Sequence, residues 1–276
     1  MKPAAFDFMM PETVAEAADA LAEYGDDARI MSGGQSLMPI LNMRLSRPEL
    51  VIDISRIESL DAIRLKDGVI EIGAGATQAA LLRWPELNAA SPLLAAALPH
   101  IGHFQTRNRG TVCGSLCHAD PSSELPLCLA VLGGDVILKN ARRERIVAAG
   151  EFQTGMLTTA KAADEIVVGA RYPVAQPGAG YAFDEITRRH GDFAIVALAA
   201  VARGSNIRLG VGGVADHPAI RDWDGIDGDD LDDALNAFAW ELGGNDDIHA
   251  TARYRREMVR TLGRRVIENA RAACRS

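Results

Sequence analysis

The chain has 276 residues, 48% of them hydrophobic and 24% charged, and a formal net charge of −8 at pH 7. These are ordinary globular values. The length allows about two domains with a core large enough to be stable without disulfides or structural metal ions. The acidic balance argues against a nucleic-acid binder, which needs a basic surface. It does not exclude an anionic ligand, because backbone N–H groups can bind phosphate without cationic side chains.

The N-terminal part of the chain predicts a small β–α–β unit with a glycine-containing loop inside it. Apolar residues recur at helical spacing from Val14 to Ala22, and Gly25 follows as a stop signal. Residues 29–31 and 50–54 form short apolar runs, which are typical of strands.

The middle of the chain is richer in short strands. Apolar or alternating runs predict strands at residues 69–73, 135–138 and 165–168. Short helices are predicted between them, over residues 77–83 and 124–132.

Breaker residues mark a boundary at Pro173 and over the segment 176–180. Beyond it, the sequence predicts a strand at residues 206–211 and helices at 229–242 and about 251–273. The last helix has an arginine-rich face, which we interpret as a solvated surface in preference to a docking surface.

No paired metal-ligand spacing is found among the four cysteines, Cys113, Cys117, Cys128 and Cys274. We therefore expect a reduced, cytoplasmic chain. Cys113 and Cys117 are one helical turn apart, but Gly114 between them argues against a helix, and we interpret the thiols as small apolar filler. His100 and His103 have a spacing that suits a metal, but no third ligand is evident nearby, so we predict no metal site.

Signatures of several other functions are absent. The sequence contains no GxGxxG after a strand, no GxxxxGK[ST], no HExxH and no GxSxG. The start of the chain lacks the long apolar segment of a signal peptide, and no apolar run is long enough to span a membrane.

Two glycine-containing segments predict a backbone cradle for one anionic ligand. The first, from Ser32 to Leu37, follows a predicted strand, and the second runs from Arg107 to Leu116. Glycines adopt positive φ at little cost and let a ligand approach the backbone, where successive N–H groups can converge on an anion. The alternative for each segment alone is an ordinary turn.

Two further polar segments are candidates for the same site. Glu124 stands at a predicted helix start, where it either accepts hydrogen bonds from sugar-like hydroxyls or only favours the helix dipole. Arg188 and Asp192 precede a buried apolar run, a position that is compatible with a site and with a simple turn.

Taken together, these segments resemble the FAD-binding subunit of the xanthine dehydrogenase and carbon monoxide dehydrogenase family of molybdenum hydroxylases. Residues 32–39 are similar to the first flavin loop of that family, and residues 109–116 to its second. Residues 119–126 resemble the segment that follows, and residues 188–194 a motif at the start of the C-terminal domain. The resemblance covers nearly the whole chain.

The sequence departs from the family pattern at three places. Cys113 stands where the family usually has a glycine, and if that position needs positive φ the cysteine would be strained and FAD affinity would fall. Glu124 replaces a common Asp, which keeps the acceptor and lengthens its reach. Residues 183–186 lack the lysine that some relatives carry there.

The resemblance implies an α+β fold. It comprises a two-subdomain FAD-binding domain of the PCMH or vanillyl-alcohol-oxidase-like type over residues 1–176, with subdomains of about 1–57 and 58–176. A smaller C-terminal α/β domain, like that of the carbon monoxide dehydrogenase flavoprotein, covers residues 177–276. The resemblance also implies that FAD is bound by the following residues: Ser32, Gly33, Gly34, Gln35, Ser36, Leu37, Thr111, Val112, Cys113, Gly114, Ser115, Glu124, Arg188 and Asp192.

The family resemblance further implies partners. A large subunit would carry molybdopterin and a small subunit two [2Fe-2S] clusters, in a heterotrimer or a dimer of heterotrimers. Electrons would pass from those clusters to the FAD and on to a terminal acceptor, so we predict no catalytic acid or base and no metal ligand in this chain. Two alternatives stay open: a free-standing flavin-dependent oxidoreductase of the same fold, and an assembly subunit that has lost its flavin.

Overall fold

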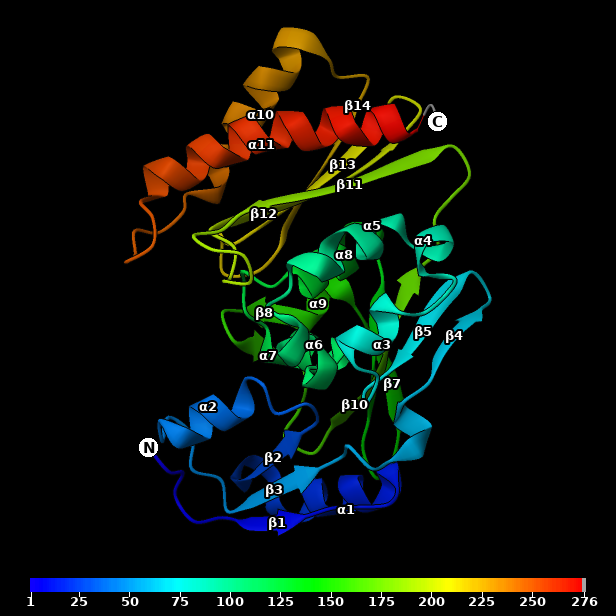
Figure 1. The fold of residues 1–276 in the computed structure, drawn as a ribbon, viewed down its shortest axis with the longest axis vertical. Coiled ribbons are helices and arrows are strands. Elements are labelled where there is room, and N and C mark those ends of the chain that lie inside the picture. Colours follow the sequence, from blue (N-terminus) through cyan, green and yellow to red (C-terminus); the bar gives the residue numbers. More distant parts are fainter. Residues whose placement is uncertain (275–276) are drawn as a thin grey trace.

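Three main sheets follow one another along the chain in the computed structural model, which describes residues 1–274 (Figure 1). The first sheet is parallel, in the order β1-β3-β2, with two helices in its connections. Its elements are β1 (Asp7–Met9), α1 (Val14–Tyr24), β2 (Ala28–Met31), α2 (Leu37–Asn42) and β3 (Leu50–Asp53). The predicted β–α–β unit is therefore confirmed.

The second sheet has five strands in the order β4-β5-β10-β6-β7, and all neighbours are antiparallel. Its strands are β4 (Ile63–Lys66), β5 (Val69–Gly73), β6 (Asp135–Lys139), β7 (Glu144–Ala148) and β10 (Ile166–Pro173). Between β5 and β6 the chain forms a run of short helices: α3 (Gln78–Leu82), α4 (Leu87–Ala90), α5 (Pro92–Ala97), α6 (Phe104–Arg109), α7 (Val112–His118) and α8 (Glu124–Leu132). The predicted strands and the helices α3 and α8 are confirmed; α4 to α6 were not predicted.

Between β7 and β10 lie the short helix α9 (Ala149–Phe152) and a two-stranded ribbon of β8 (Gln153–Gly155) and β9 (Thr158–Thr159). The turn between these two strands reaches back toward α7, because the Leu157 N–H donates to the Ala119 carbonyl at 3.0 Å. Residues after this ribbon thereby come close to a helix that lies forty residues earlier in the chain.

The third sheet is an antiparallel meander, β11-β12-β13-β14, joined by hairpins. Its elements are β11 (Ala179–Ile186), β12 (Val196–Arg203), β13 (Asn206–Gly212), β14 (Ala219–Asp224), α10 (Gly228–Leu242) and α11 (Ala252–Ala273). Helices α10 and α11 cover one face, and α5 and α8 pack against the other (Figure 1). Strand β12 is buried on both faces, which explains why its sequence is continuously apolar instead of alternating.

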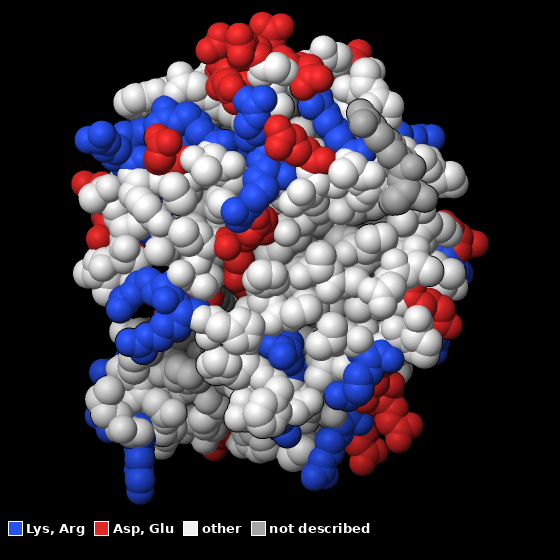
Figure 2. All heavy atoms as spheres, turned by 45° about the horizontal axis from the view of Figure 1, so that its top comes forward, with Lys and Arg blue, Asp and Glu red and all other residues white. Residues whose placement is uncertain are grey.

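Charged side chains gather over the C-terminal helices. Figure 2 shows basic and acidic residues interspersed there, above a largely uncharged middle of the same face. Several arginines of α11 hold the helix to its neighbours: Arg265 pairs with Asp184 at 2.6 Å and Arg260 donates to Asn236 at 2.6 Å. Among residues 1–274, no helix is both long and apolar enough to cross a membrane.

Candidate functional site

The segment after β2 and the α6–α7 connection are in close backbone contact beside the first sheet. The segment after β2 lies against the α6–α7 connection so closely that a Cβ on Gly33 would be 2.7 Å from the Arg109 carbonyl carbon and 2.8 Å from the Gly110 Cα. The Ser32 hydroxyl donates to the Ala74 carbonyl at 3.0 Å, which ties the same segment to the end of β5. Gly34 has a φ of +70°, a conformation that glycine adopts at no steric cost.

The second predicted segment comprises the end of α6 and the first turn of α7. The Thr111 hydroxyl accepts from the Gly114 N–H at 3.1 Å and thereby caps α7, so the prediction that Gly114 would prevent a helix is wrong. A threonine cap and burial of the apolar face outweigh the modest helix penalty of one glycine. The Val112 N–H donates to the Ala76 carbonyl at 3.1 Å and joins the segment to the β5–α3 turn.

Cys113 is not strained. It lies in the first turn of α7 and is not among the positive-φ residues of the described chain, so the strain considered for this position is absent. Its side chain is 1% exposed and its thiol donates to the Ile72 carbonyl at 3.5 Å. Burial raises the pKa of the Cys113 thiol well above its usual value, which keeps the group neutral. The interpretation as apolar filler fits this environment.

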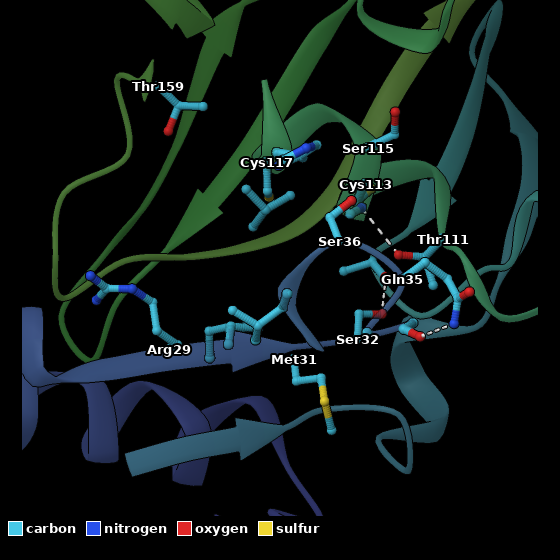
Figure 3. Close-up of a pocket in the computed structure, with 18 of the residues that line it drawn as sticks. Arg29, Met31, Ser32, Gln35, Ser36, Thr111, Cys113, Ser115, Cys117 and Thr159 are labelled. Atoms are coloured by element: carbon cyan, nitrogen blue, oxygen red, sulfur yellow. Dashed lines mark hydrogen bonds between the residues drawn. The ribbon is translucent and has the colours of Figure 1, made fainter. Parts of the chain in front are cut away.

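Most of the predicted site residues line one cavity of about 760 Å³ (Figure 3). The lining residues among them are Ser32, Gly33, Gly34, Gln35, Ser36, Leu37, Thr111, Cys113, Gly114, Ser115 and Glu124. Val112 is fully buried behind this lining. Arg188 and Asp192 are exposed in the β11–β12 connection and do not line the cavity.

Two cationic residues of the cavity had not been predicted. Arg29 lies near the start of β2 at one side of the cavity (Figure 3), where its guanidinium donates to the Asp26 and Ala28 carbonyls at 2.7 Å. Lys161 follows β9 and donates to the Ala162 carbonyl at 2.8 Å. Burial lowers the pKa of Lys161. No local pattern marked either residue, because β2 and the segment after β9 come to line one cavity only in the tertiary structure.

The side chain of Gln78 places a hydrogen-bond acceptor without a partner in the cavity wall. It is the first residue of α3 and is 5% exposed, and its Oε1 is buried without a hydrogen-bond partner among the described residues. A buried carbonyl oxygen of this kind gains a partner when a ligand hydroxyl or amide binds beside it. With Arg29, Lys161 and the N–H groups of two helix starts, the lining suits a ligand that carries phosphates and hydroxyls.

Glu124 contributes a buried carboxyl group to the same cavity. It is the first residue of α8 and is 4% exposed. Burial raises the pKa of Glu124 to about 8, and the charge of Glu185 acts in the same direction. The helix start was predicted, but the depth of burial was not, because it depends on strands from the C-terminal part of the chain.

The raised pKa of Glu124 predicts a pH-dependent stability. The folded chain holds a proton on Glu124 up to about pH 8, whereas the unfolded chain releases it near 4.5. This stabilisation is complete below the unfolded pKa and is lost as pH rises through 8, at up to about 1.4 kcal/mol per pKa unit. We expect urea unfolding of the flavin-free chain to show a stability decline between pH 5 and 8.5 that is flatter in Glu124→Gln. Glu23→Gln, on the exposed side of α1, should keep the wild-type slope, and an equal slope in Glu124→Gln would contradict the assignment.

The Thr111 cap predicts a second, smaller effect. Thr111→Val keeps the shape of the side chain and removes the oxygen that accepts from Gly114. We expect a loss of about 1 kcal/mol in the free energy of unfolding, as for other capping residues. Thr111→Ser should restore most of it in the same urea titration. Equal stability of the Val and Ser variants would show that the cap contributes nothing.

Comparisons with known proteins agree with this geometry. Residues 4–175 match the family model described as the FAD binding domain in molybdopterin dehydrogenase. The chain is 40% identical over 195 residues to caffeine dehydrogenase subunit beta of Pseudomonas sp. (strain CBB1), in an alignment that covers 70% of this chain and 66% of that subunit. It is 36% identical to the 6-hydroxypseudooxynicotine dehydrogenase complex subunit alpha of Paenarthrobacter nicotinovorans, over 98% of this chain and 96% of that subunit.

The fold also matches a solved structure. Superposition on a chain of the reconstituted CO dehydrogenase from Oligotropha carboxidovorans gives a TM-score of 0.94 at 32% identity, covering 99% of this chain and all of the other. The predicted α+β class is thereby confirmed. This chain belongs to the family of the FAD-binding domain of molybdopterin dehydrogenases, as a medium-chain homologue of carbon monoxide dehydrogenase and related molybdenum hydroxylases.

Proposed function

We propose that this chain binds FAD in the described cavity and acts as the electron-transfer flavoprotein of a heteromeric molybdenum hydroxylase. It would take electrons from the [2Fe-2S] clusters of a small subunit and pass them to a terminal acceptor, while a large subunit carries molybdopterin. The proposal rests on the two segments 32–37 and 111–115, which pack against each other and line one cavity. The same cavity is lined by two cationic side chains, Arg29 and Lys161, and by the Gln78 Oε1, a hydrogen-bond acceptor without a partner among the described residues.

Each part of the lining has a proposed role toward FAD. N–H groups of the two segments and the hydroxyls of Ser36 and Ser115 would donate to the pyrophosphate, while the Ser32 hydroxyl keeps its bond to the Ala74 carbonyl. Gln78 and Glu124 would hold the hydroxyls of the ribityl chain or ribose. The bound flavin supplies the redox chemistry, and the protein supplies binding, orientation and electrostatics.

We further propose the division of the chain into an FAD-binding domain over residues 1–176, with subdomains of about 1–57 and 58–176, and a C-terminal domain over 177–276. The change of sheet between β10 and β11 supports the main boundary. Arg188 and Asp192, exposed beyond the cavity, fit the side of the molecule that meets a partner. Assembly into a heterotrimer or a dimer of heterotrimers, and a cytoplasmic location, belong to the same proposal.

The absorption spectrum of the purified chain tests cofactor binding first. We expect an oxidised-flavin spectrum and release of FAD, identified by chromatography, on denaturation. A colourless chain that also fails to bind added FAD would contradict the proposal and favour the flavin-less assembly subunit.

Partner capture tests the second half of the proposal. A tagged chain expressed in its own host should co-purify with a molybdopterin-containing large subunit and an iron–sulfur small subunit. A yellow chain that purifies alone and oxidises an alcohol by itself would instead favour the free-standing oxidoreductase.

A further inference from the structure

Three acid–base side chains from distant parts of the sequence lie on elements that pack together beside the cavity. We name them the buried acid cluster: His100 after α5, Glu124 at the start of α8 and Glu185 in β11. The His100 Nδ1 and the Glu185 Oε1 form an ion pair at 3.2 Å. The Glu185 side chain is 4% exposed and that of His100 is 38% exposed, so the cluster reaches from the solvent into the protein.

One carboxylate oxygen of the cluster has no hydrogen-bond donor among the described residues. The Glu185 Oε2 is buried and has no hydrogen-bond partner among residues 1–274. A buried carboxylate oxygen without a donor is costly, and a shared proton or a bridging water would satisfy it. Glu124 belongs to α8, which packs against the turn that carries His100 and against β12, the neighbour of β11.

The charges around the cluster require one extra proton. Two buried carboxyl groups face a single imidazole, and the other titratable groups that act on the cluster, Asp120, Asp184 and Cys128, add no positive charge. Three ionised members would therefore leave a net negative charge in a poorly solvated site. Retention of one proton by the carboxyl groups restores neutrality. The pKa of Glu124 is accordingly raised by burial, and that of His100 by its hydrogen bond to Glu185.

We propose that the buried acid cluster is a proton relay that connects solvent at His100 with the cavity at Glu124. The Glu124 carboxyl releases its proton to a basic atom of the cavity ligand. Glu124 takes a replacement through the free Oε2 of Glu185, and the His100–Glu185 pair recovers that proton from water at the exposed imidazole. One proton crosses from solvent to the cavity, and the charge of the cluster is unchanged at the end of the cycle.

The use of this proton rests on the proposed function. Two-electron reduction of a flavin, with electrons from the iron–sulfur partner, also takes up protons, and the buried acid cluster would deliver one of them. The alternative is that His100 and Glu185 only join the helical segment to β11. Such an ion pair would affect stability but would leave the rate of proton arrival in the cavity unchanged.

The protonated carboxyl group can be detected without any flavin. Infrared spectra of the full-length flavin-free chain near pH 7 should contain the carbonyl stretch of a neutral carboxylic acid. We expect the band to disappear in Glu124→Gln and to shift in Glu185→Gln. Absence of the band in the wild-type chain would overturn the relay, whether or not the chain binds FAD.

The transfer itself is measured on the FAD-loaded chain. After chemical reduction at pH 8.5, a rapid jump to pH 6 makes the flavin absorbance report the arrival of the proton. We expect at least a tenfold slower change in Glu185→Gln, with FAD content as in the wild type. Asp222→Asn is the matched control, because this carboxylate of the same sheet pairs with Arg208 at 2.7 Å and is not among the groups that act on the cluster, so its rate should be unchanged.

The outcomes separate the two proposals. An unchanged rate in Glu185→Gln at normal FAD content would overturn the relay and leave FAD binding intact. A wild-type chain without FAD would contradict the proposed function, while the infrared band would still decide whether the cluster holds its proton.

Discussion

Gly33→Ala is expected to weaken FAD binding strongly. The three atoms nearest to the new Cβ all belong to the backbone: the Arg109 carbonyl oxygen, the Arg109 carbonyl carbon at 2.7 Å and the Gly110 Cα at 2.8 Å. A flexible side chain could move aside, but here the segment 32–37 must separate from the α6–α7 connection. Overpacking of this kind typically costs about 1–3 kcal/mol, which corresponds to roughly a tenfold to hundredfold loss of affinity.

Gly155→Ala is the matched control for this experiment. Gly155 lies in β8, has no positive φ, and a Cβ there would meet nothing within 4 Å. FAD titration of the two variants therefore separates the collision from the general effect of removing a glycine, and circular dichroism confirms that both are folded. Wild-type affinity in Gly33→Ala would show that the two segments need not touch to hold the ligand.

Arg255→Met is expected to cause the largest loss of stability in the C-terminal part. The Arg255 guanidinium is the buried connection between α11 and two other segments: it donates to the Ile195 carbonyl and the Gly213 carbonyl, both at 2.6 Å. It also pairs with Asp247 at 2.6 Å. Methionine fills most of the volume but removes the donor to both carbonyls and leaves Asp247 without its cation, so we expect a loss of roughly 3 kcal/mol or more.

Arg253→Met, two residues earlier and exposed, provides the comparison. It removes the same charge at nearly the same place on α11, and its unfolding midpoint in urea should stay close to that of the wild type. If Arg255→Met unfolded at the same urea concentration as Arg253→Met, the buried guanidinium would have no stabilising role. FAD content should fall less than stability does, because Arg255 does not line the cavity.

Helices and strands that are marked by residues close together in the chain could be predicted from the sequence. Helix α8 begins and ends at the predicted residues because Ser123 and Gly133 bound a continuous apolar run. Strands β2, β3, β5, β6 and β10 were predicted from apolar runs a few residues long, since burial of one face leaves a direct mark on the sequence. Strands β4 and β7, at the exposed edges of the second sheet, were not predicted. The two glycine segments were likewise visible, because close backbone approach requires small residues in a row.

The tertiary structure decided what depends on distant partners. Gly114 argued against a helix at this place. The Thr111 cap and the burial of Cys113, whose thiol donates to the Ile72 carbonyl, nevertheless make the segment helical. Lys161 and Gln78 enter the cavity only because the β8–β9 ribbon and the β5–α3 turn are brought beside it. Long-range contacts of this kind leave no periodicity in the chain.

The charge state of the site was decided in the same way. Glu124 looked like a helix-start carboxylate, which is ordinarily ionised, and Glu185 like one residue of a strand. Folding places both beside His100 under a sheet formed by later residues, and exclusion of water then shifts the pKa of Glu124 upward. A pKa is set by the solvent and charges around a group, and neither is encoded at the residue's own position in the sequence.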